Sequence, residues 1–455
     1  MKLHIKINNK VTNWFDCMTG VKQGDNISPT IFSIFINDLV KEVNDLDLGF
    51  DLGERKVSML LYADDIVMFA KTKEDLQSML NVLHNWCKRW RVLINTDKSK
   101  CMHFRKGRTA QTDQIFTVGG NVLEMVETYK YLGVTFHYKG NFSINAEILA
   151  KGAGRALGKI ISKIHNLKDI GLKTFEKLYV SGVTPILDYC SGVWGYRKFQ
   201  TIDNIQHKAI RYFLGVHRFA PLIAINGDIG WLPSNYRRWL NMIRYWNRLI
   251  NFDDHRLTKY VFKLDYTNGR SNWCSELKDV LIKLILNVHY ENKSAVNLQT
   301  VSEKRNNYFS NIWRNSLPNV SKLRTYAKFK NVFKTENYTL LNLRKYERSM
   351  LTQFRCGILP LRIETGRYIG ERPEDRLCSF CQSRSIEDEC HFLINCTFYR
   401  DIRTDMFSDQ LNKNNFTVLS DSDKLVQLVN NYPRKVAKFI VKSYLKRRKA
   451  IYNTR

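Results

Sequence analysis

The chain has 455 residues, of which 44% are hydrophobic and 12% aromatic, a composition that excludes an intrinsically disordered protein. It carries 72 Lys and Arg against 43 Asp and Glu, which gives a formal net charge of +29. This excess favours a protein that binds a polyanion such as nucleic acid, and the alternative is an ordinary basic protein. At roughly 150 residues per domain, this length predicts about three domains.

The opening residues, MKLHIKINNK, lack the apolar core of a signal peptide. No apolar run reaches the ~18 residues of a membrane span, so we expect no membrane partner. The chain has 10 cysteines, with one close cluster at 378–396. This usage predicts an intracellular protein, in the nucleus or the cytoplasm, whose thiols are free or bound to metal. The oligomeric state stays open.

The first part of the chain mixes strand and helix patterns. Residues 2–8 alternate between apolar and polar side chains, which predicts a strand followed by a turn at NNK. Residues 28–43 predict a helix with Ser28 as N-cap and Pro29 at its first position. The expected apolar face of this helix consists of Ile31, Phe32, Phe35, Leu39 and Val43.

Residues 57–70, which contain LLYADDIVMFA, predict two strands joined by a turn at Asp64 and Asp65. A second helix is predicted over 71–90, with Thr72 and Asp75 as a capping box. Its apolar stripe consists of Leu76, Met79, Leu80, Leu83, Trp86 and Trp90. Residues 91–104 predict a strand with a polar turn in it, and residues 129–136 predict another strand. We therefore expect an α+β region whose strands build one antiparallel sheet.

The pattern becomes helical beyond this region, and we expect four parts: 1–142, 143–345, 346–410 and 411–455. In the second part, Arg and Lys are interleaved with Trp and Tyr, which suits either nucleic-acid contacts or an aromatic core under a solvated basic surface. The last part contains a basic amphipathic helix, which either grips nucleic acid or docks by its apolar side. The basic face of that helix carries Lys435, Lys438, Lys442, Lys446 and Lys449. Its apolar face carries Val436, Phe439, Ile440 and Tyr444.

Asp64 and Asp65 interrupt an apolar run, and a turn is the usual structural role of such a pair. No Gly or Asn accompanies them, which is poor chemistry for a hairpin turn, and the apolar flanks predict that both carboxylates are partly buried. Adjacent buried carboxylates cost free energy unless a cation neutralises them. Hard oxygen ligands of this kind predict a Mg²⁺ site.

The cysteine cluster has the spacing Cys-x2-Cys-x9-His-x4-Cys. Thiolates and an imidazole at this spacing can form a closed structural Zn²⁺ site, and the predicted ligands are Cys378, Cys381, His391 and Cys396. Cys390 is a rival ligand, and the alternative is a set of side chains without metal. A zinc module here could present Arg376 and Arg384 to nucleic acid.

Four motifs resemble those of reverse transcriptases, in the order of that family. YADD between hydrophobic strands resembles the catalytic hairpin, and GVKQGDNISPTIFSIFINDL resembles the Gln-Gly and Ser-Pro block that precedes it. INTDKSK resembles the Asn-x-x-Lys motif, and YKYLGV resembles the primer-grip strand. The style is that of non-LTR (LINE-like) retrotransposons, and the resemblance extends through the helical middle to the Cys/His cluster.

The resemblance implies a partial polymerase palm, a helical thumb or connector, a zinc-knuckle-like module and a basic tail. It implies two-metal nucleotidyl transfer by an RNA-directed DNA polymerase, with an RNA template, a DNA primer or target, dNTP and Mg²⁺. Asp64 would be a direct Mg²⁺ ligand supported by Asp65, and Lys98 a proton donor near the leaving pyrophosphate. The residues implied to bind template, nucleotide and primer end are Gln23, Gly24, Tyr131, Leu132 and Gly133.

A two-metal site needs a further carboxylate, which in the family lies well upstream of the Gln-Gly block. Asp16 is the sole acid before that block, and its context, NWFDCMTG, predicts a loop residue rather than a ligand. We therefore expect an N-terminally truncated polymerase that is inactive as this chain. The alternative is a non-catalytic nucleic-acid-binding remnant or repurposed fragment. A group II intron maturase would share YADD but would not explain the Cys/His cluster.

Overall fold

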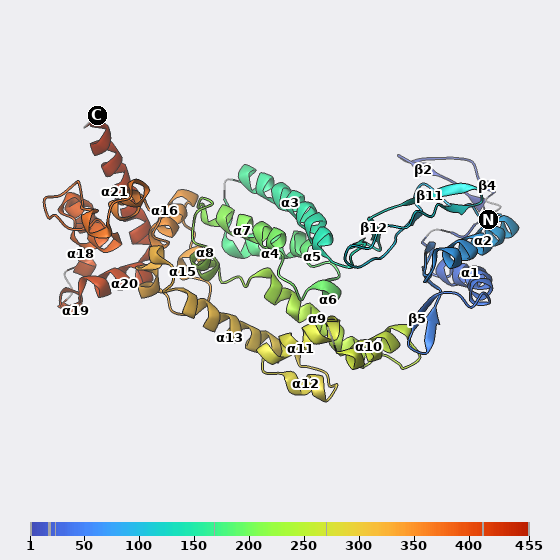
Figure 1. Cartoon of the computed structure of the whole chain (residues 1–455). Helices are drawn as coiled ribbons and strands as arrows, with labels where there is room; N and C mark the ends of the chain where they lie inside the picture. The colour runs from blue at the N-terminus through green and yellow to red at the C-terminus, as the bar shows by residue number, and fades with distance from the viewer. Residues whose placement is uncertain are drawn as a thin grey trace. The chain divides into compact units, whose positions relative to one another are not determined.

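The computed structural model describes residues 2–16, 20–22, 24–167, 169–269, 271–411 and 414–453. The chain divides into two compact units, unit 1 (residues 1–141) and unit 2 (residues 142–455), and Figure 1 labels many of their elements. Over the described ranges, no helix combines the length and the apolarity that crossing a bilayer requires. The finer division into four parts stays a prediction.

Helix α1 (Ser28–Asn44) confirms the first predicted helix but not its predicted cap. Ile27 occupies the N-cap position without a side-chain hydrogen bond, and Ser28 is already helical. The Ser28 hydroxyl donates to the main-chain carbonyl of Lys22 at 2.6 Å, so it is committed to the preceding loop instead of the helix end. Ile31, expected on the apolar face, is exposed.

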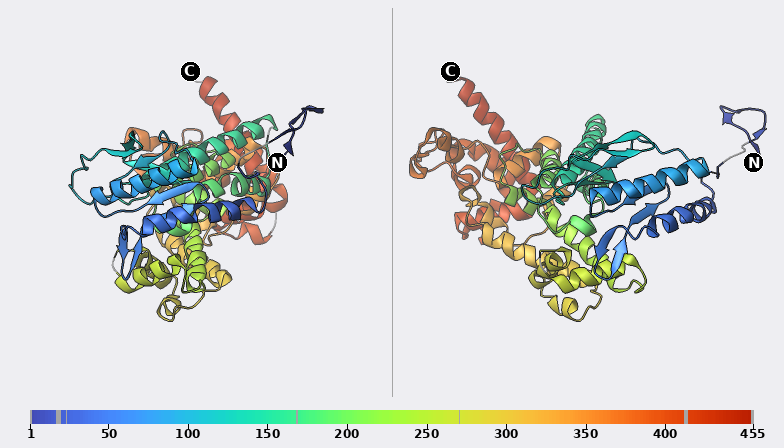
Figure 2. Two further views of the ribbon diagram at one scale, coloured as in Figure 1. Left: turned by 90° about the vertical axis from the view of Figure 1, so that its right-hand side faces the viewer. Right: turned by 45° about the vertical axis from the view of Figure 1, so that its right-hand side comes forward.

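Helix α2 (Lys73–Trp90) begins two residues later than predicted, and Thr72 caps it because its hydroxyl accepts the main-chain N–H of Asp75 at 3.1 Å. Its stripe is buried except for its ends, where Leu76 is half-buried and Trp90 is exposed. Helices α1 and α2 lie side by side (Figure 2) and share the core of unit 1 with the strands. The buried members of this core are Ile36, Leu39, Val43, Met59, Met79, Leu80, Leu83, Trp86, Cys87, Cys101, Phe116, Val118 and Leu123.

The strands of unit 1 are short, and over the residues that the structure describes they form six small sheets instead of the single antiparallel sheet that the pattern predicted. Most of them pair with the next strand along the chain through a tight turn, so the hydrogen bonding closes locally. Strands β9 and β11 pair in parallel. The strands are β1 (Lys2–Leu3), β2 (Lys6–Ile7), β3 (Lys10–Val11), β4 (Phe15–Asp16), β5 (Phe50–Leu52), β6 (Arg55–Val57), β7 (Met59–Tyr62), β8 (Asp65–Met68), β9 (Lys100–Cys101), β10 (Phe116–Val118), β11 (Asn121–Met125), β12 (Thr128–Tyr131) and β13 (Val134–His137).

Several predicted strands are therefore interrupted. Residues 2–8 contain β1 and β2, residues 91–104 contain only β9, and residues 129–136 form a hairpin rather than one strand. Asp16, predicted in a loop, ends strand β4 opposite Lys2. A tight turn divides residues 129–136, whereas residues 4 and 5 separate β1 from β2 without a turn. The turn at residues 96–98 precedes β9, in the segment where a polar turn was predicted.

Unit 2 is helical among its described residues, as the pattern from residue 143 onward predicted. Its helices are α3 (Ser143–Asn166), α4 (Leu172–Gly182), α5 (Thr184–Leu187), α6 (Ser191–Trp194), α7 (Gln200–Leu214), α8 (Leu222–Ile229), α9 (Ser234–Ile250), α10 (Leu257–Asn268), α11 (Trp273–Lys283), α12 (Asn287–Glu291), α13 (Leu298–Ser316), α14 (Tyr326–Phe329), α15 (Asn337–Leu340), α16 (Lys345–Arg355), α17 (Arg362–Thr365), α18 (Arg400–Leu411), α19 (Asn414–Thr417), α20 (Asp421–Asn431) and α21 (Pro433–Asn453).

The aromatic residues of unit 2 serve mainly as core. Trp194, Trp239, Trp246 and Trp313 are buried, which favours the aromatic-core interpretation for these side chains over base stacking. One hydrophobic cluster extends from Ala146 to Ile440, so residues from three of the predicted parts pack in a single core.

Helix α21 is docked by its apolar side, which is the second of the two predicted alternatives. Val436, Phe439 and Ile440 are fully buried, and α21 packs against α16 and α18. Three lysines of its basic face pair with aspartates spaced four residues apart on α18: Lys446 with Asp401 at 2.7 Å, Lys442 with Asp405 at 3.0 Å and Lys435 with Asp409 at 3.5 Å. Much of this basic face is therefore used within unit 2.

Candidate functional site

The two adjacent aspartates lie at the tip of the hairpin β7–β8, which confirms the predicted strand, turn and strand. Tyr62 pairs with Asp65 at the end of the ladder, and Ala63 and Asp64 form the two-residue turn. Ala63 adopts a left-handed conformation with φ 52°, although it is not a glycine. The turn thus forms without the Gly or Asn that usually marks it.

Asp64 and Asp65 are exposed, so the predicted partial burial of their carboxylates is wrong. The apolar flanks Leu61, Ile66 and Met68 are half-buried against the core of unit 1, and the tip extends beyond the part of the hairpin that they cover. Neither carboxylate has a hydrogen bond or an ion pair with another described residue. Both are therefore available to a cation or a ligand.

The negative charge at this tip acts on Tyr131. Burial raises the pKa of Tyr131, and the negative charge of Asp65 raises that pKa further. Tyr131 ends strand β12, and the turn that follows consists of Leu132 and Gly133 with φ 46° and 83°. Two left-handed residues make this a type I′ hairpin turn, in which Gly133 is favoured because it lacks a side chain.

Lys98 is held next to strand β12 of the β12–β13 hairpin. Its main-chain N–H donates to the Asn95 side-chain oxygen at 3.1 Å, which fixes the turn that carries Lys98. The Tyr129 hydroxyl donates to the Lys98 carbonyl at 3.1 Å, and Tyr129 lies two residues before Tyr131 on β12. Asn95 is the Asn of the Asn-x-x-Lys motif and Tyr129 is the first residue of YKYLGV, but sequence reasoning assigned a role to neither side chain.

Of the two residues predicted to line the pocket for template and nucleotide, Gln23 and Gly24, the structure describes only Gly24. Gln23 lies outside the described residues. Gly24 has φ 82°, a left-handed conformation that favours glycine, and its position is open because a Cβ atom would meet nothing within 4 Å. Within the described part of unit 1, no hydrogen bond or ion pair joins Gly24 to the β7–β8 hairpin.

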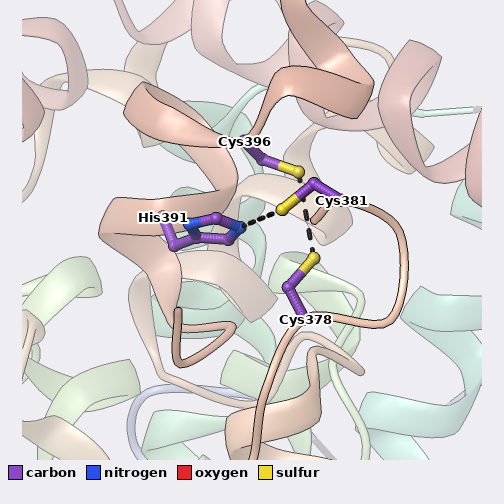
Figure 3. A group of neighbouring side chains, drawn as sticks. All are labelled: Cys378, Cys381, His391 and Cys396. Carbon is purple, nitrogen blue, oxygen red and sulfur yellow. Dashed lines mark hydrogen bonds between the residues drawn. The ribbon is translucent and has the colours of Figure 1, made fainter. Parts of the chain in front are cut away.

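In unit 2 the structure brings the four predicted metal ligands together (Figure 3). The ligand atoms of Cys378, Cys381, His391 and Cys396 all lie within 4.8 Å of one another. The Sγ atoms of Cys378 and Cys396 are 3.9 Å apart, and Cys381 Sγ is 3.4 Å from His391 Nε2. Cys390, the rival ligand, is not part of this group.

The backbone of the two arms fixes these positions. The Cys378 N–H donates to the Ser385 carbonyl at 2.9 Å and so closes the first arm into a tight loop. The Cys396 N–H donates to the His391 carbonyl at 2.8 Å, at the end of the π-helical segment His391–Asn395. Arg403 donates to the Cys396 carbonyl at 2.9 Å, so helix α18 supports the last ligand.

Glu387, which sequence reasoning missed, joins this cluster to the C-terminal helix. Its fully buried carboxylate accepts two hydrogen bonds from the Arg447 guanidinium and lies 3.8 Å from Cys378 Sγ. The same carboxylate accepts the main-chain N–H of Arg362 at 2.7 Å. The cluster is therefore built into the packing of unit 2.

The two arginines proposed for nucleic-acid contact differ. The Arg376 guanidinium donates to the carbonyls of Glu371 and Ile363, so its role is structural. Arg384 is exposed, with φ 50°, and has no hydrogen-bond or ion-pair partner among the described residues. Only Arg384 can present its charge to a partner.

Comparison with known proteins matches residues 1–136 to the family described as reverse transcriptase (RNA-dependent DNA polymerase). The chain is 25% identical over 223 residues to the RNA-directed DNA polymerase from mobile element jockey of Drosophila melanogaster, which covers 47% of this chain and 24% of the relative. It is 24% identical over 273 residues to the Pol polyprotein from the type-1 retrotransposable element R2 of Popillia japonica, covering 55% and 43%.

A third relative is the Pol polyprotein from the type-2 retrotransposable element R2DM of Drosophila melanogaster, 30% identical over 296 residues, which covers 60% of this chain and 27% of the relative. The chain matches about a quarter of the length of most of these curated relatives. The family match covers the β7–β8 hairpin, the Lys98 turn and all but the last residue of the β12–β13 hairpin. Residues 1–136 therefore carry a reverse transcriptase domain, and the chain is a relative of the reverse transcriptases of non-LTR retrotransposons.

Proposed function

We propose that this chain supplies the β7–β8 hairpin to the polymerase centre of an RNA-directed DNA polymerase, which extends a DNA primer along an RNA template with dNTP as substrate. The observation that carries the proposal is a pair of exposed carboxylates, Asp64 and Asp65, at the tip of the β7–β8 hairpin within the residues that match the reverse transcriptase family. The relative named above as an RNA-directed DNA polymerase, from mobile element jockey, supports it.

In this proposal Asp64 and Asp65 hold Mg²⁺ through carboxylate oxygens, the ligand type that this cation prefers. When bound, the metal would stabilise charge on the reacting phosphate and lower the pKa of the attacking hydroxyl. Lys98 would give a proton to the leaving pyrophosphate. Tyr131, with the turn at Leu132 and Gly133, would position the primer end, and Gln23 and Gly24 would line the pocket for template and nucleotide.

We further propose that the purified chain alone does not extend a primer. Within the described ranges, Asp64 and Asp65 are not joined by a third acidic side chain in a group that could hold metal, and a two-metal centre needs more carboxylate ligands. Robust Mg²⁺-dependent extension that Asp64→Ala abolishes would contradict this part of the proposal.

The site itself is tested with Mn²⁺ as a paramagnetic probe of the full chain. Mn²⁺ should broaden the signals of the β7–β8 hairpin, and Asp64→Asn should remove that broadening. Asp45→Asn is the matched control, because Asp45 is an exposed aspartate elsewhere in unit 1. Equal broadening in the wild type and in Asp64→Asn would overturn the assignment of these carboxylates to a cation.

We also propose that Cys378, Cys381, His391 and Cys396 bind Zn²⁺ in a structural site. A tetrahedral ion with Zn–S bonds of about 2.3 Å places two sulfur ligands about 3.8 Å apart, and the Cys378 and Cys396 sulfurs are separated by 3.9 Å. Four protein ligands leave no open position for substrate, so the ion would stabilise the fold. A site of this kind suits an intracellular, reducing compartment.

Metal analysis of the natively purified chain tests this assignment. We expect about one equivalent of zinc in the wild type and in Cys390→Ser, and a loss of most of it in Cys381→Ser. A chain that holds no zinc, or a loss caused equally by Cys390→Ser, would contradict the predicted ligand set.

A further inference from the structure

Unit 2 contains a polar groove that the polymerase proposal does not use. Two adjoining cavities, of about 280 Å³ and about 530 Å³, lie between residues 329–341 and the junction of α20 with α21. They share Asn337, Asn430 and Asn431 in their walls. We call this feature the asparagine groove and define it by Asn331, Lys334, Asn337, Asn430, Asn431 and Arg434.

The floor of the asparagine groove is electrically neutralised. Glu336 forms ion pairs with Lys330 and, at 2.9 Å, with Arg355. Arg355 also pairs with the fully buried Asp228 at 3.1 Å. Because the acids beneath the groove are already matched by buried cations, they would not repel an anion entering from solvent.

The rim offers hydrogen-bonding groups that are still available. The side-chain amides of Asn331, Asn337 and Asn431 are exposed, and they have no hydrogen-bond partner among the described residues. Asn430 donates to the Phe329 carbonyl at 3.2 Å, which holds α20 against the opposite wall and leaves its own side-chain oxygen available. One wall therefore faces the other with carboxamides on both sides.

Two cations and two apolar side chains complete the rim. Lys334 and Arg434 are exposed, and neither side chain forms an ion pair with a described residue. Val332 and Leu340 are also exposed, at 46% and 48%, beside the carboxamides. The groove thus combines positive charge, amide groups and apolar surface, which are the three kinds of group that an unpaired nucleotide contacts.

We propose that the asparagine groove binds a single-stranded segment of nucleic acid, with phosphates at Lys334 and Arg434 and base edges at the carboxamides. Cavities of this size are in the range of pockets for small ligands, so they suit one or two splayed nucleotides rather than a duplex. A carboxamide presents a donor and an acceptor together, which gives preference among bases. The inference rests on the proposed nucleic-acid function but uses none of the residues of the hairpin site.

The test measures binding of the full chain to fluorescent 12-nucleotide homopolymers of RNA and DNA over a range of salt concentrations. Lys334→Ala with Arg434→Ala should weaken binding to every sequence and reduce the slope of log affinity against log salt by about 1.4, since each cation on a single strand contributes about 0.7. Asn337→Ala with Asn431→Ala should reduce the preference among bases severalfold and leave the salt slope unchanged.

Lys208→Ala with Asn292→Ala is the matched control, because both residues are exposed in unit 2 and neither lines the groove. Wild-type binding that both groove pairs leave intact would overturn this inference alone, whereas no binding of any nucleic acid by the wild type would overturn the proposed function as well. Competition by a free mononucleotide as strong as that by the 12-mer would also overturn it, because the groove would then be a nucleotide site.

Discussion

The hydroxyl of Tyr129 donates a hydrogen bond to the main-chain carbonyl of Lys98 at 3.1 Å. This bond joins strand β12 to the turn that Asn95 organises, so it keeps Lys98 next to the strand that carries Tyr131. The INTDKSK and YKYLGV motifs are therefore joined through Tyr129, a residue of the second motif to which no catalytic or binding role is assigned.

Tyr129→Phe removes this bond and leaves the ring in place. We expect unit 1 to lose about 0.5–1.5 kcal/mol of stability, and amide hydrogen exchange to become faster at residues 95–101 and 128–137. Tyr62→Phe is the control, because Tyr62 is exposed and its hydroxyl has no partner among the described residues. Equal exchange in Tyr129→Phe and the wild type would show that the bond does not hold the turn.

The Glu387–Arg447 pair is buried, and breaking one side of it leaves a charge without its partner. We expect Glu387→Gln to lower the free energy of unfolding of unit 2 by about 3–5 kcal/mol. Asp405→Asn breaks an exposed pair with Lys442 and should cost less than about 1 kcal/mol. Urea denaturation measures both, and similar losses in the two variants would contradict the assigned role of Glu387.

Removal of zinc should affect more than the loop that would bind it. Cys378 and Cys396 belong to the same hydrophobic cluster as Phe439 of α21, and Glu387 connects the cysteine cluster to Arg447. Because metal binding is coupled to folding, a strong chelator should speed hydrogen exchange in α21 as well as in residues 377–396. Faster exchange confined to 377–396 would instead identify an autonomous module.

Acidification should destabilise unit 2 through His207. Burial lowers the pKa of His207, and the nearby Asp203 opposes this only in part. Histidine in an unfolded chain titrates near ~6.5, so below this pH the unfolded state binds more protons than the folded state. The stability that neutral His207 contributes is fully present above pH ~6.5 and is lost as the pH falls toward the lower folded-state pKa.

His207→Gln should therefore flatten the fall in unfolding midpoint between about pH 7.5 and about pH 5.5, measured by circular dichroism. His165→Gln, at an exposed position on α3, should leave that fall unchanged. A wild-type slope in His207→Gln would mean that other groups account for the acid sensitivity.

Local signals in the sequence predicted much of this architecture. Helices α1 and α2, the β7–β8 turn and the helical character of unit 2 follow from side-chain periodicity and capping residues that act over a few positions. The assembly of Cys378, Cys381, His391 and Cys396 also follows, because two short arms carry all four residues.

Features that depend on contacts distant in sequence were not predictable in this way. The exposure of Asp64 and Asp65 depends on how much of the hairpin the core covers. The parallel pairing of β9 with β11 joins strands that are distant in sequence, and side-chain periodicity gives no information about which strands pair. The partnership of Glu387 with Arg447 joins residues 60 positions apart. Partners that are distant in sequence can be identified only from the folded structure.

The left-handed conformation of Ala63 restricts which amino acids the hairpin tip accepts. This backbone region costs an L-residue roughly 1–2 kcal/mol, so Gly would relieve strain, Asn and Asp would be tolerated, and Val or Ile would clash. A saturation library at position 63, selected only for folded protein and sequenced, should retain Ala, Gly, Asn and Asp and lose the β-branched residues. The small set of amino acids accepted at position 63 would then be explained by backbone geometry alone, without any requirement from catalysis.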